Sequence, residues 1–396
     1  MKYVIIIGDG MADFPLDELD GKTPLEVAHK PNIDSIASKG KLGTLKTIPN
    51  GMEAGSDIAN LSILGYDPKR YYTGRGPLEA ASIGVELRPD DMAFRCNLIT
   101  EEDGHLKDYC AGHITIEEAV DLIKDAKEAF KEIGDFYPGV SYRHLFVLRD
   151  GGDELKCTPP HDVTGGGISS HLIKPEDNAV AKRLNSMILN SKDVLSNHPV
   201  NIKRIEKGLN PANMIWLWGQ GRRPKIEPLK EKYGVTGAVV SAVDLIRGIG
   251  IYAEMDILDV PGATGYYDTD YEAKADYAAR ALKDHDLVYV HIESIDEAGH
   301  AGDVEMKIKC IEDFDERLVG RLLDNLTGDY SIAILPDHYT PIMTMTHDPT
   351  PVPFVTSKPR KGNDGIGKFT ESTAKRGSFG SIEGEEFMRL FLNEKS

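Results

Sequence analysis

The sequence has few cysteines and no long hydrophobic run. Only four cysteines occur among 396 residues, and no two of them form a CxxC pair. We therefore expect reduced thiols in a reducing compartment rather than a disulfide framework. The longest early apolar run extends only from Tyr3 to Ile7, which is too short for a signal peptide or a membrane-spanning helix. These absences predict a cytoplasmic protein with no membrane partner.

Positive charge is also scarce. Lysine and arginine number 46 against 64 aspartates and glutamates, which gives a formal net charge of −18. This balance argues against a nucleic-acid partner, because phosphate backbones are bound by clustered cations. The hydrophobic share of 40% and the charged share of 28% are typical of a folded globular protein. At roughly 150 residues per domain, the length predicts two or three domains.

Apolar runs rich in β-branched residues alternate with amphipathic stretches of helical period. The predicted strands are residues 3–7, 143–148, 214–217, 238–241, 287–292 and 331–335, and the predicted helices are 116–133, 177–189, 271–282 and 304–326. Such alternation indicates an α/β fold with a mostly parallel sheet flanked by helices. Residues 86–233 have strands and helices of their own but lack the strand-end residues described next. We expect them to form a smaller inserted α/β cap domain, and residues 1–85 and 234–396 to form the core.

Three of the predicted strands end in aspartate or histidine. Ligands collect at the carboxyl ends of strands in such sheets. The residues concerned are Asp9 after the first strand, Asp296 and His300 after strand 287–292, Asp337 and His338 after strand 331–335, and His347 nine positions further on. Mixed carboxylate and imidazole ligands suit Mn²⁺, Zn²⁺ or Fe²⁺ better than Ca²⁺. Their number predicts two metal ions. His291 and Glu293 lie on the strand itself, and we interpret them as packing groups or as outer neighbours of the site.

Ser56 is the predicted nucleophile. It follows Gly55 and precedes an apolar stretch that is typical of a helix. A serine at a helix start lies beside free backbone N–H groups and the positive end of the helix dipole, which together bind anions. Two metal ions about 4 Å apart hold a phosphoryl group during in-line displacement. The alternative is that Ser56 only caps the helix.

Seven segments together resemble the alkaline phosphatase superfamily and, more narrowly, its archaeal-type cofactor-independent phosphoglycerate mutases. They are VIIIGDGM (4–11), GSDIANLSILGYDP (55–68), YTGRGPLEA (72–80), WLWGQGRRP (216–224), HIESIDEAGH (291–300), PDH (336–338) and THDPTPVPF (346–354). In this order they span nearly the whole chain. The resemblance implies an alkaline-phosphatase-like fold. It also implies an isomerase of glycolysis and gluconeogenesis that interconverts 3-phosphoglycerate and 2-phosphoglycerate without 2,3-bisphosphoglycerate.

The resemblance also implies roles for individual residues. Ser56 matches the nucleophile that becomes phosphoserine, and it ligates one ion together with Asp9, Asp337 and His338. Asp296, His300 and His347 match the ligands of a second ion. The implied metal is Mn²⁺, with Mg²⁺, Co²⁺ or Zn²⁺ also used in the family. Arg222 and Arg223 are similar to its substrate arginines. Arg143, His113 and His161 are further candidates for substrate binding, and Asp162 or His161 is the candidate acid/base.

Other functions stay open at this point. A metal-dependent phosphatase or another phosphomutase could use the same metal core. A metal-stabilised binding protein, in which Ser56 is only a cap, is the alternative that is not an enzyme. A mutase must keep water away from its phosphoserine, which would give a closing cap domain its purpose. The expected partner is a small phosphorylated substrate, and the sequence says nothing of the oligomeric state.

Overall fold

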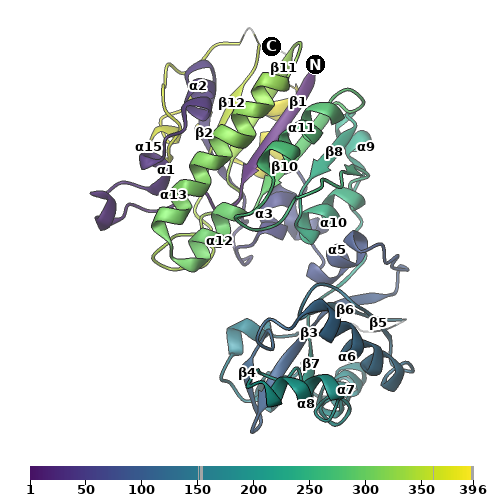
Figure 1. Ribbon diagram of the computed structural model, residues 1–396. Helices are drawn as coiled ribbons and strands as arrows, with labels where there is room; N and C mark the ends of the chain where they lie inside the picture. Colours follow the sequence, from purple (N-terminus) through teal and green to yellow (C-terminus); the bar gives the residue numbers. More distant parts are fainter. Residues whose placement is uncertain (150, 152–154, 360, 394–396) are drawn as a thin grey trace. The chain divides into compact units, whose positions relative to one another are not determined.

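The chain forms two compact units in the computed structural model, which describes residues 1–149, 151, 155–359 and 361–393. The first unit comprises Met1–Tyr72 and Lys225–Ser396, and the second comprises Thr73–Pro224 (Figure 1). The second unit begins before the predicted boundary at residue 86 because helix α5 (Arg75–Ser82) packs on strand β3 (Met92–Glu102). Gly76 permits this contact, since a Cβ there would stand 2.4 Å from the Ala93 carbonyl oxygen. The unit ends before residue 233 because Tyr233 donates a hydrogen bond to the Gly65 carbonyl of the first unit.

The first unit is built on an eight-stranded sheet in the order β13-β2-β12-β11-β1-β10-β8-β9. The strands are β1 (Lys2–Gly8), β2 (Lys41–Lys46), β8 (Gly237–Val240), β9 (Asp256–Ile257), β10 (Leu287–Ile292), β11 (Tyr330–Leu335), β12 (Val352–Ser357) and β13 (Ser381–Glu383). Only β12 runs antiparallel to its neighbours. The β-branched run of β1 is buried on both faces, as a central parallel strand requires. The predicted mostly parallel α/β sheet is thus confirmed.

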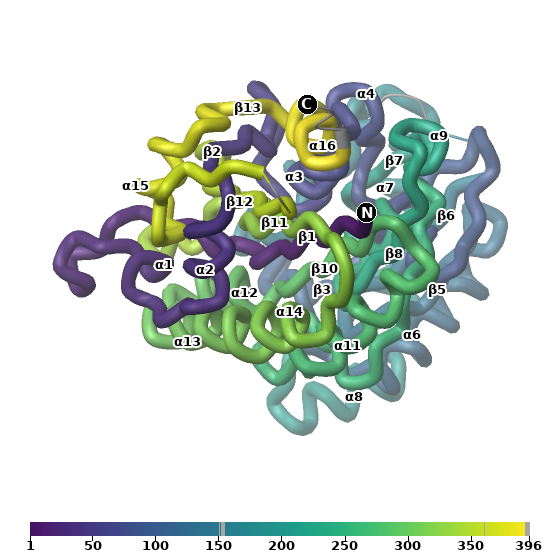
Figure 2. The backbone as a smooth tube through the Cα atoms, turned by 90° about the horizontal axis from the view of Figure 1, so that it is seen from above, coloured from purple at the N-terminus to yellow at the C-terminus, as the bar shows by residue number. Residues whose placement is uncertain are grey.

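Helices cover both faces of this sheet. They are α1 (Pro24–Val27), α2 (Pro31–Lys39), α3 (Ser56–Ile63), α4 (Pro68–Tyr71), α9 (Leu229–Tyr233), α10 (Asp244–Tyr252), α11 (Tyr271–Ala281), α12 (Ser294–Ala301), α13 (Val304–Asp313), α14 (Arg321–Asn325), α15 (Glu371–Ala374) and α16 (Gly384–Asn393). Helices α2, α11, α13 and α14 lie on one face, and α3 and α16 lie on the other (Figure 2). A π-helical stretch, Phe314–Gly320, joins α13 to α14, so the predicted helix 304–326 is one continuous run with a wider turn inside it.

The register of the central strands brings three strand ends to one edge. Gly8 of β1 is level with Ile292 of β10, and Ile7 is level with Leu335 of β11. The segments that follow these strands therefore start side by side. This confirms the expectation that the ends of the three strands share one edge of the sheet.

A buried ion pair holds the segments behind this edge. Lys307 of α13 is fully buried, and its Nζ donates to Asp13 Oδ2 at 2.7 Å and to the Thr340 carbonyl at 2.8 Å. Asp13 follows β1 and Thr340 follows β11. The pair therefore ties together two of the segments that form the sheet edge. The folded state is strongly destabilised when a buried carboxylate loses its positively charged partner.

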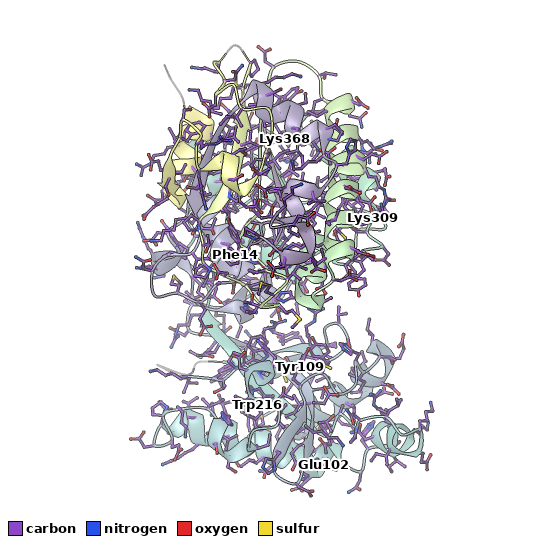
Figure 3. The ribbon with its side chains drawn as sticks, turned by 90° about the vertical axis from the view of Figure 1, so that its left-hand side faces the viewer. Phe14, Glu102, Tyr109, Trp216, Lys309 and Lys368 are labelled. Carbon is purple, nitrogen blue, oxygen red and sulfur yellow. The ribbon has the colours of Figure 1, made fainter. Side chains whose placement is uncertain are left out.

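Lys307→Met is expected to lower the free energy of unfolding by about 3–5 kcal/mol, because it leaves the Asp13 carboxylate buried and unpaired. Urea unfolding followed by circular dichroism measures the change. Lys309→Met is the control, since Lys309 lies on the outer surface of the same helix (Figure 3) and pairs with Asp313 in solvent. Equal losses in the two variants would contradict a structural role for the buried pair.

The second unit contains a five-stranded antiparallel sheet. Strand β3 pairs with β4 (His105–Asp108), β6 (Arg143–Leu148) and β7 (Met214–Arg222), and β5 (Asp135–Tyr137) pairs with β6. Helices α6 (Ile116–Ala129) and α7 (Ala179–Leu195) share a hydrophobic core with one face, and α8 (Pro199–Glu206) packs beside α6. Short 3₁₀ turns occupy Pro160–Val163 and Ile168–His171. Among the described residues of the whole chain, no helix combines the length and the apolar character needed to cross a membrane.

Candidate metal centre and nucleophile

Ser56 is the first residue of α3 and points toward the sheet edge. The N-cap of this helix is Gly55, and no side chain caps it by hydrogen bonding. Ser56 Oγ lies 3.1 Å from Nε2 of His338. Asn60, one turn further on, donates from Nδ2 to the Ser56 carbonyl oxygen at 2.7 Å and to Asp337 Oδ2 at 2.9 Å. The geometry therefore favours a chemical role for the hydroxyl over a capping role.

Asp9 and Asp337 adjoin His338, the histidine beside this hydroxyl. Nε2 of His338 is 3.5 Å from Asp9 Oδ1 and 3.6 Å from Asp337 Oδ2, and all three side chains are fully buried. The turn after β11 is held locally, because Asp337 Oδ1 accepts the backbone N–H of His338 at 2.9 Å and of Gly10 at 3.3 Å. Four predicted ligands of the first ion thus lie together.

Asp296, His300 and His347 form an adjoining group. Asp296 lies in the first turn of α12, and His300 stands one turn later with its Nε2 3.1 Å from Asp296 Oδ2. Nε2 of His347 is 3.7 Å from Asp296 Oδ1 and 2.9 Å from Nε2 of His300. The rings of His338 and His347 have centroids 4.0 Å apart, so the two groups are contiguous. The three predicted ligands of the second ion therefore also lie together.

The second nitrogen of each histidine in this group faces a backbone carbonyl. Nδ1 of His300 is 3.0 Å from the Met345 oxygen, and Nδ1 of His347 is 3.3 Å from the Ala54 oxygen. A carbonyl can only accept, so each Nδ1 carries a proton and Nε2 is the nitrogen that faces Asp296. This is the arrangement expected of metal-ligating histidines.

The charge balance of the cluster also fits divalent ions. Neither oxygen of Asp9 has a hydrogen-bond partner within the described chain. Burial, followed by repulsion from Asp337 and Asp296, raises the pKa of Asp9 well above its usual value. Burial alone would also raise the pKa of Asp296, but hydrogen bonds from His300 and His347 hold it well below its usual value. Buried carboxylates this close to one another must be neutralised by bound cations or by protons. The donor set therefore suits bound metal.

His291 and Glu293 were not predicted as ligands, yet they adjoin the cluster. His291 of β10 is 1% exposed. Its Nε2 lies 3.3 Å from Asp9 Oδ2 and 4.0 Å from Asp337 Oδ2, and its Nδ1 lies 3.8 Å from Glu293 Oε2. The feature of the sequence that could have pointed to His291 is its position near the carboxyl end of an otherwise apolar, fully buried strand.

The predicted substrate residues lie in the second unit, where three of them join an aromatic cluster. Tyr142 lies near the His113 ring, at 5.9 Å between centroids, and near the Arg143 guanidinium, at 5.8 Å. The His161 ring is 5.2 Å from Trp218. The other three predicted residues are Arg222, Arg223 and Asp162. Arg222 donates a hydrogen bond to the Asp90 carbonyl at 3.1 Å, and Arg223 is exposed. Asp162 is also exposed, and its Oδ1 lies 3.6 Å from Nε2 of His161.

Sequence reasoning missed two arginines of this cluster. The guanidinium of Arg95 lies 4.5 Å from the Trp218 ring centre, and that of Arg75 lies 5.8 Å from it. Arg95 is buried and pairs with Glu79 at 2.8 Å. Burial, together with repulsion from Arg75 and Arg143, lowers the pKa of Arg95. Three guanidinium groups thus raise the local positive potential. The signal for Arg75 was the Gly-Arg-Gly segment, which was noted only as part of a resemblance.

An α/β core with carboxylates, imidazoles and a serine hydroxyl at one sheet edge defines the class of metal-dependent phosphoryl-transfer enzymes. A family model of 2,3-bisphosphoglycerate-independent phosphoglycerate mutase matches residues 37–201. The chain is 53% identical to 2,3-bisphosphoglycerate-independent phosphoglycerate mutase 2 of Methanothermobacter thermautotrophicus, over 99% of this chain and 98% of that one. It is 52% identical to the mutase of Methanosarcina barkeri over the full length of both. The chain belongs to the 2,3-bisphosphoglycerate-independent phosphoglycerate mutase family, as the sequence segments predicted.

Solved structures agree with this assignment. A protein from Pyrococcus horikoshii is 33% identical and superposes with a TM-score of 0.85 over 98% of this chain and 96% of that one. The cofactor-independent phosphoglycerate mutase of Thermoplasma acidophilum is 29% identical, with a TM-score of 0.66 over 99% of both chains. The likeness therefore spans both units of the chain.

Proposed function

We propose that the chain interconverts 3-phosphoglycerate and 2-phosphoglycerate through a phosphoserine at Ser56, in glycolysis and gluconeogenesis and without 2,3-bisphosphoglycerate. The observation that carries this proposal is the position of Ser56 Oγ, 3.1 Å from Nε2 of His338, which itself adjoins the buried carboxylates of Asp9 and Asp337. The scattered cysteines, which form no disulfide, support a cytoplasmic location. The substrate would be the only small-molecule partner that the reaction needs.

Two sets of residues would hold two divalent ions. Asp9, Ser56, Asp337 and His338 form the first set, and Asp296, His300 and His347 form the second. We propose Mn²⁺ because the two sets contain carboxylates and imidazoles in equal number. Bound divalent ions would lower the pKa of the serine hydroxyl and balance the charge of the phosphoryl group.

Ser56 would act as the nucleophile. Its Oγ loses a proton and forms a bond to phosphorus, the ester bond to the glycerate oxygen breaks, and that oxygen takes up a proton. The other glycerate hydroxyl then loses its proton and bonds to phosphorus, the bond between phosphorus and Ser56 Oγ breaks, and Oγ takes up a proton. Burial lowers the pKa of His338 to about 4, so its ring is neutral at pH 7. Its Nδ1 lies 3.2 Å from Thr340 Oγ1, whose hydroxyl donates to Asp296, so Nδ1 carries the proton and Nε2 the lone pair. The N-terminus of α3 would stabilise the phosphoryl oxygens.

The aromatic cluster of the second unit is the proposed site for the glycerate carboxylate. Arg143, His113 and His161 were predicted for substrate binding, and Arg75 and Arg95 add positive charge beside Trp218. Guanidinium groups bind carboxylates through paired hydrogen bonds. Arg222 and Arg223 remain candidates for the same role. Asp162 or His161 would exchange protons with the glycerate hydroxyls.

Arg143→Gln is expected to raise the KM for phosphoglycerate about tenfold while changing kcat less, because a bound carboxylate would lose one charged partner. Steady-state kinetics measures both constants. Arg183→Gln is the control, since Arg183 is an exposed residue of α7 in the same unit. An unchanged KM in Arg143→Gln would remove this residue from the proposed site.

The activity itself is tested with purified protein, 3-phosphoglycerate and no added bisphosphoglycerate, with formation of 2-phosphoglycerate followed by a coupled enzyme. Released inorganic phosphate is measured in the same samples. We expect isomer formation to exceed phosphate release by a wide margin, because the phosphoryl group returns from Ser56 to glycerate. Phosphate release exceeding isomer formation would identify a phosphatase instead, and a requirement for bisphosphoglycerate would contradict the proposal.

A further inference from the structure

We propose that His291 is a further ligand of the ion held by Asp9 and Asp337, and that Glu293 orients it. The proposal rests on the function proposed above and adds two residues to its metal site. His291 is a fully buried imidazole in which neither nitrogen has a hydrogen-bond partner among the described residues. A buried polar ring without partners is costly. Such a ring beside two carboxylates requires an explanation.

The two oxygens of Asp9 face in different directions. Oδ1 is 3.5 Å from Nε2 of His338, and Oδ2 is 3.3 Å from Nε2 of His291. The His291 ring hydrogen-bonds to neither Asp9 nor Asp337, although it approaches both. Ligands bonded to one ion at about 2.1 Å stand roughly 3–3.5 Å apart. The spacing between His291 and Asp9 therefore fits two atoms that share an ion.

Asp9, His291 and Asp337 also lie close together as a group of three. One ligand atom from each lies within 4.8 Å of the other two, and all three residues are buried. Asp337 Oδ2 is also 3.6 Å from Nε2 of His338. His291 therefore approaches the same two carboxylates as His338. It would contribute a second imidazole to the first ion.

Glu293 determines which nitrogen of His291 is free. Its Oε2 is 3.8 Å from Nδ1, whereas Asp9 and Asp337 lie near Nε2. With Asp9 and Asp337 bound to the ion, Glu293 is the carboxylate left to take the proton of Nδ1, and the Nε2 lone pair is then directed at the ion. Metal-ligating histidines commonly have a carboxylate or carbonyl at the second nitrogen. Backbone carbonyls provide this for His300 and His347, and Glu293 would provide it for His291.

The experiment measures Mn²⁺ binding to the full chain, first freed of metal with a chelator. Binding is followed by the electron paramagnetic resonance signal of free Mn²⁺. We expect the unsubstituted protein to bind two ions per chain. His291→Ala should weaken one of them about 100-fold or more, and Glu293→Gln should weaken the same one about tenfold. The control is His144→Ala, which removes another buried histidine whose Nε2 has no partner and should leave both affinities unchanged.

A second measurement separates ligation from positioning. Pulsed electron paramagnetic resonance of the Mn²⁺-loaded protein, with and without ¹⁵N-histidine, counts the coupled histidine nitrogens. Loss of one coupled nitrogen in His291→Ala supports ligation. Unchanged affinities, an unchanged nitrogen count, or three ions per unsubstituted chain would each overturn the proposal. Mutase activity of the unsubstituted protein is tested separately. If the metal-binding results contradict a role for His291, the proposed reaction still stands. If the protein shows no mutase activity, the metal-binding results can still be interpreted.

Discussion

Ser56→Ala is expected to lower kcat for the isomerisation by about 10⁴-fold or more, because the reaction loses its nucleophile and no phosphoserine can form. The hydroxyl lies 3.1 Å from His338 Nε2, at the point where the two predicted ligand groups meet. The side chain makes no capping hydrogen bond in α3, so its removal should cost little stability. The coupled assay for 2-phosphoglycerate measures the loss, and a thermal unfolding scan checks the fold.

Ser62→Ala provides the matched control for this substitution. Ser62 is a buried serine on the same helix, and it is not among the predicted site residues. The variant should keep most of the activity. Incubation with ³²P-labelled 3-phosphoglycerate followed by acid quenching should label the unsubstituted protein and Ser62→Ala, but not Ser56→Ala. A Ser56→Ala protein with more than a tenth of the original kcat would refute nucleophilic catalysis by this residue.

The grouping of the candidate ligands could be predicted because these residues follow apolar strands in a fixed way. Parallel strands in register place their carboxyl ends at one edge, so Asp9, Asp296 and Asp337 were expected to meet there. Ser56 could not be assigned to the site from the periodicity of the sequence alone, since a serine at a helix start is usually a cap. Its position beside His338 depends on the packing of α3, whose Asn60 bonds to Asp337.

His291 was harder to identify for a physical reason. Neighbouring side chains in a strand point to opposite faces, and a lone histidine in a buried strand gives no sign of which groups it meets. Arg95 presents the same difficulty. It lies within strand β3 of the second unit, and its closeness to Trp218 arises from the pairing of β3 with β7, far away in the sequence. Contacts across a sheet of this kind depend on register, which the sequence pattern leaves open.

Removal of metal is expected to abolish isomerisation and also to destabilise the protein. Asp9 and Asp337 are fully buried, Asp296 is 3% exposed, and Glu293 adjoins them. Without cations these carboxylates repel one another, and this repulsion contributes to the raised pKa of Asp9. A ligand at 100 times its dissociation constant stabilises the folded state by about 2.7 kcal/mol. Loss of one such ion should lower Tm by about 3 °C in a chain of 396 residues, because the entropy of unfolding is about 2.1 cal/mol/K per residue.

The measurement is a thermal scan and a mutase assay before chelation, after chelation and after Mn²⁺ is restored, all at one pH and ionic strength. The double variant Asp296→Asn/Asp337→Asn is the control, because it removes a carboxylate from each ligand group and with it much of the repulsion. Its Tm should respond little to the chelator. If the unsubstituted protein kept both its Tm and its activity after exhaustive chelation, the buried carboxylates would have to be neutralised by protons, and the sheet edge would not be a metal centre.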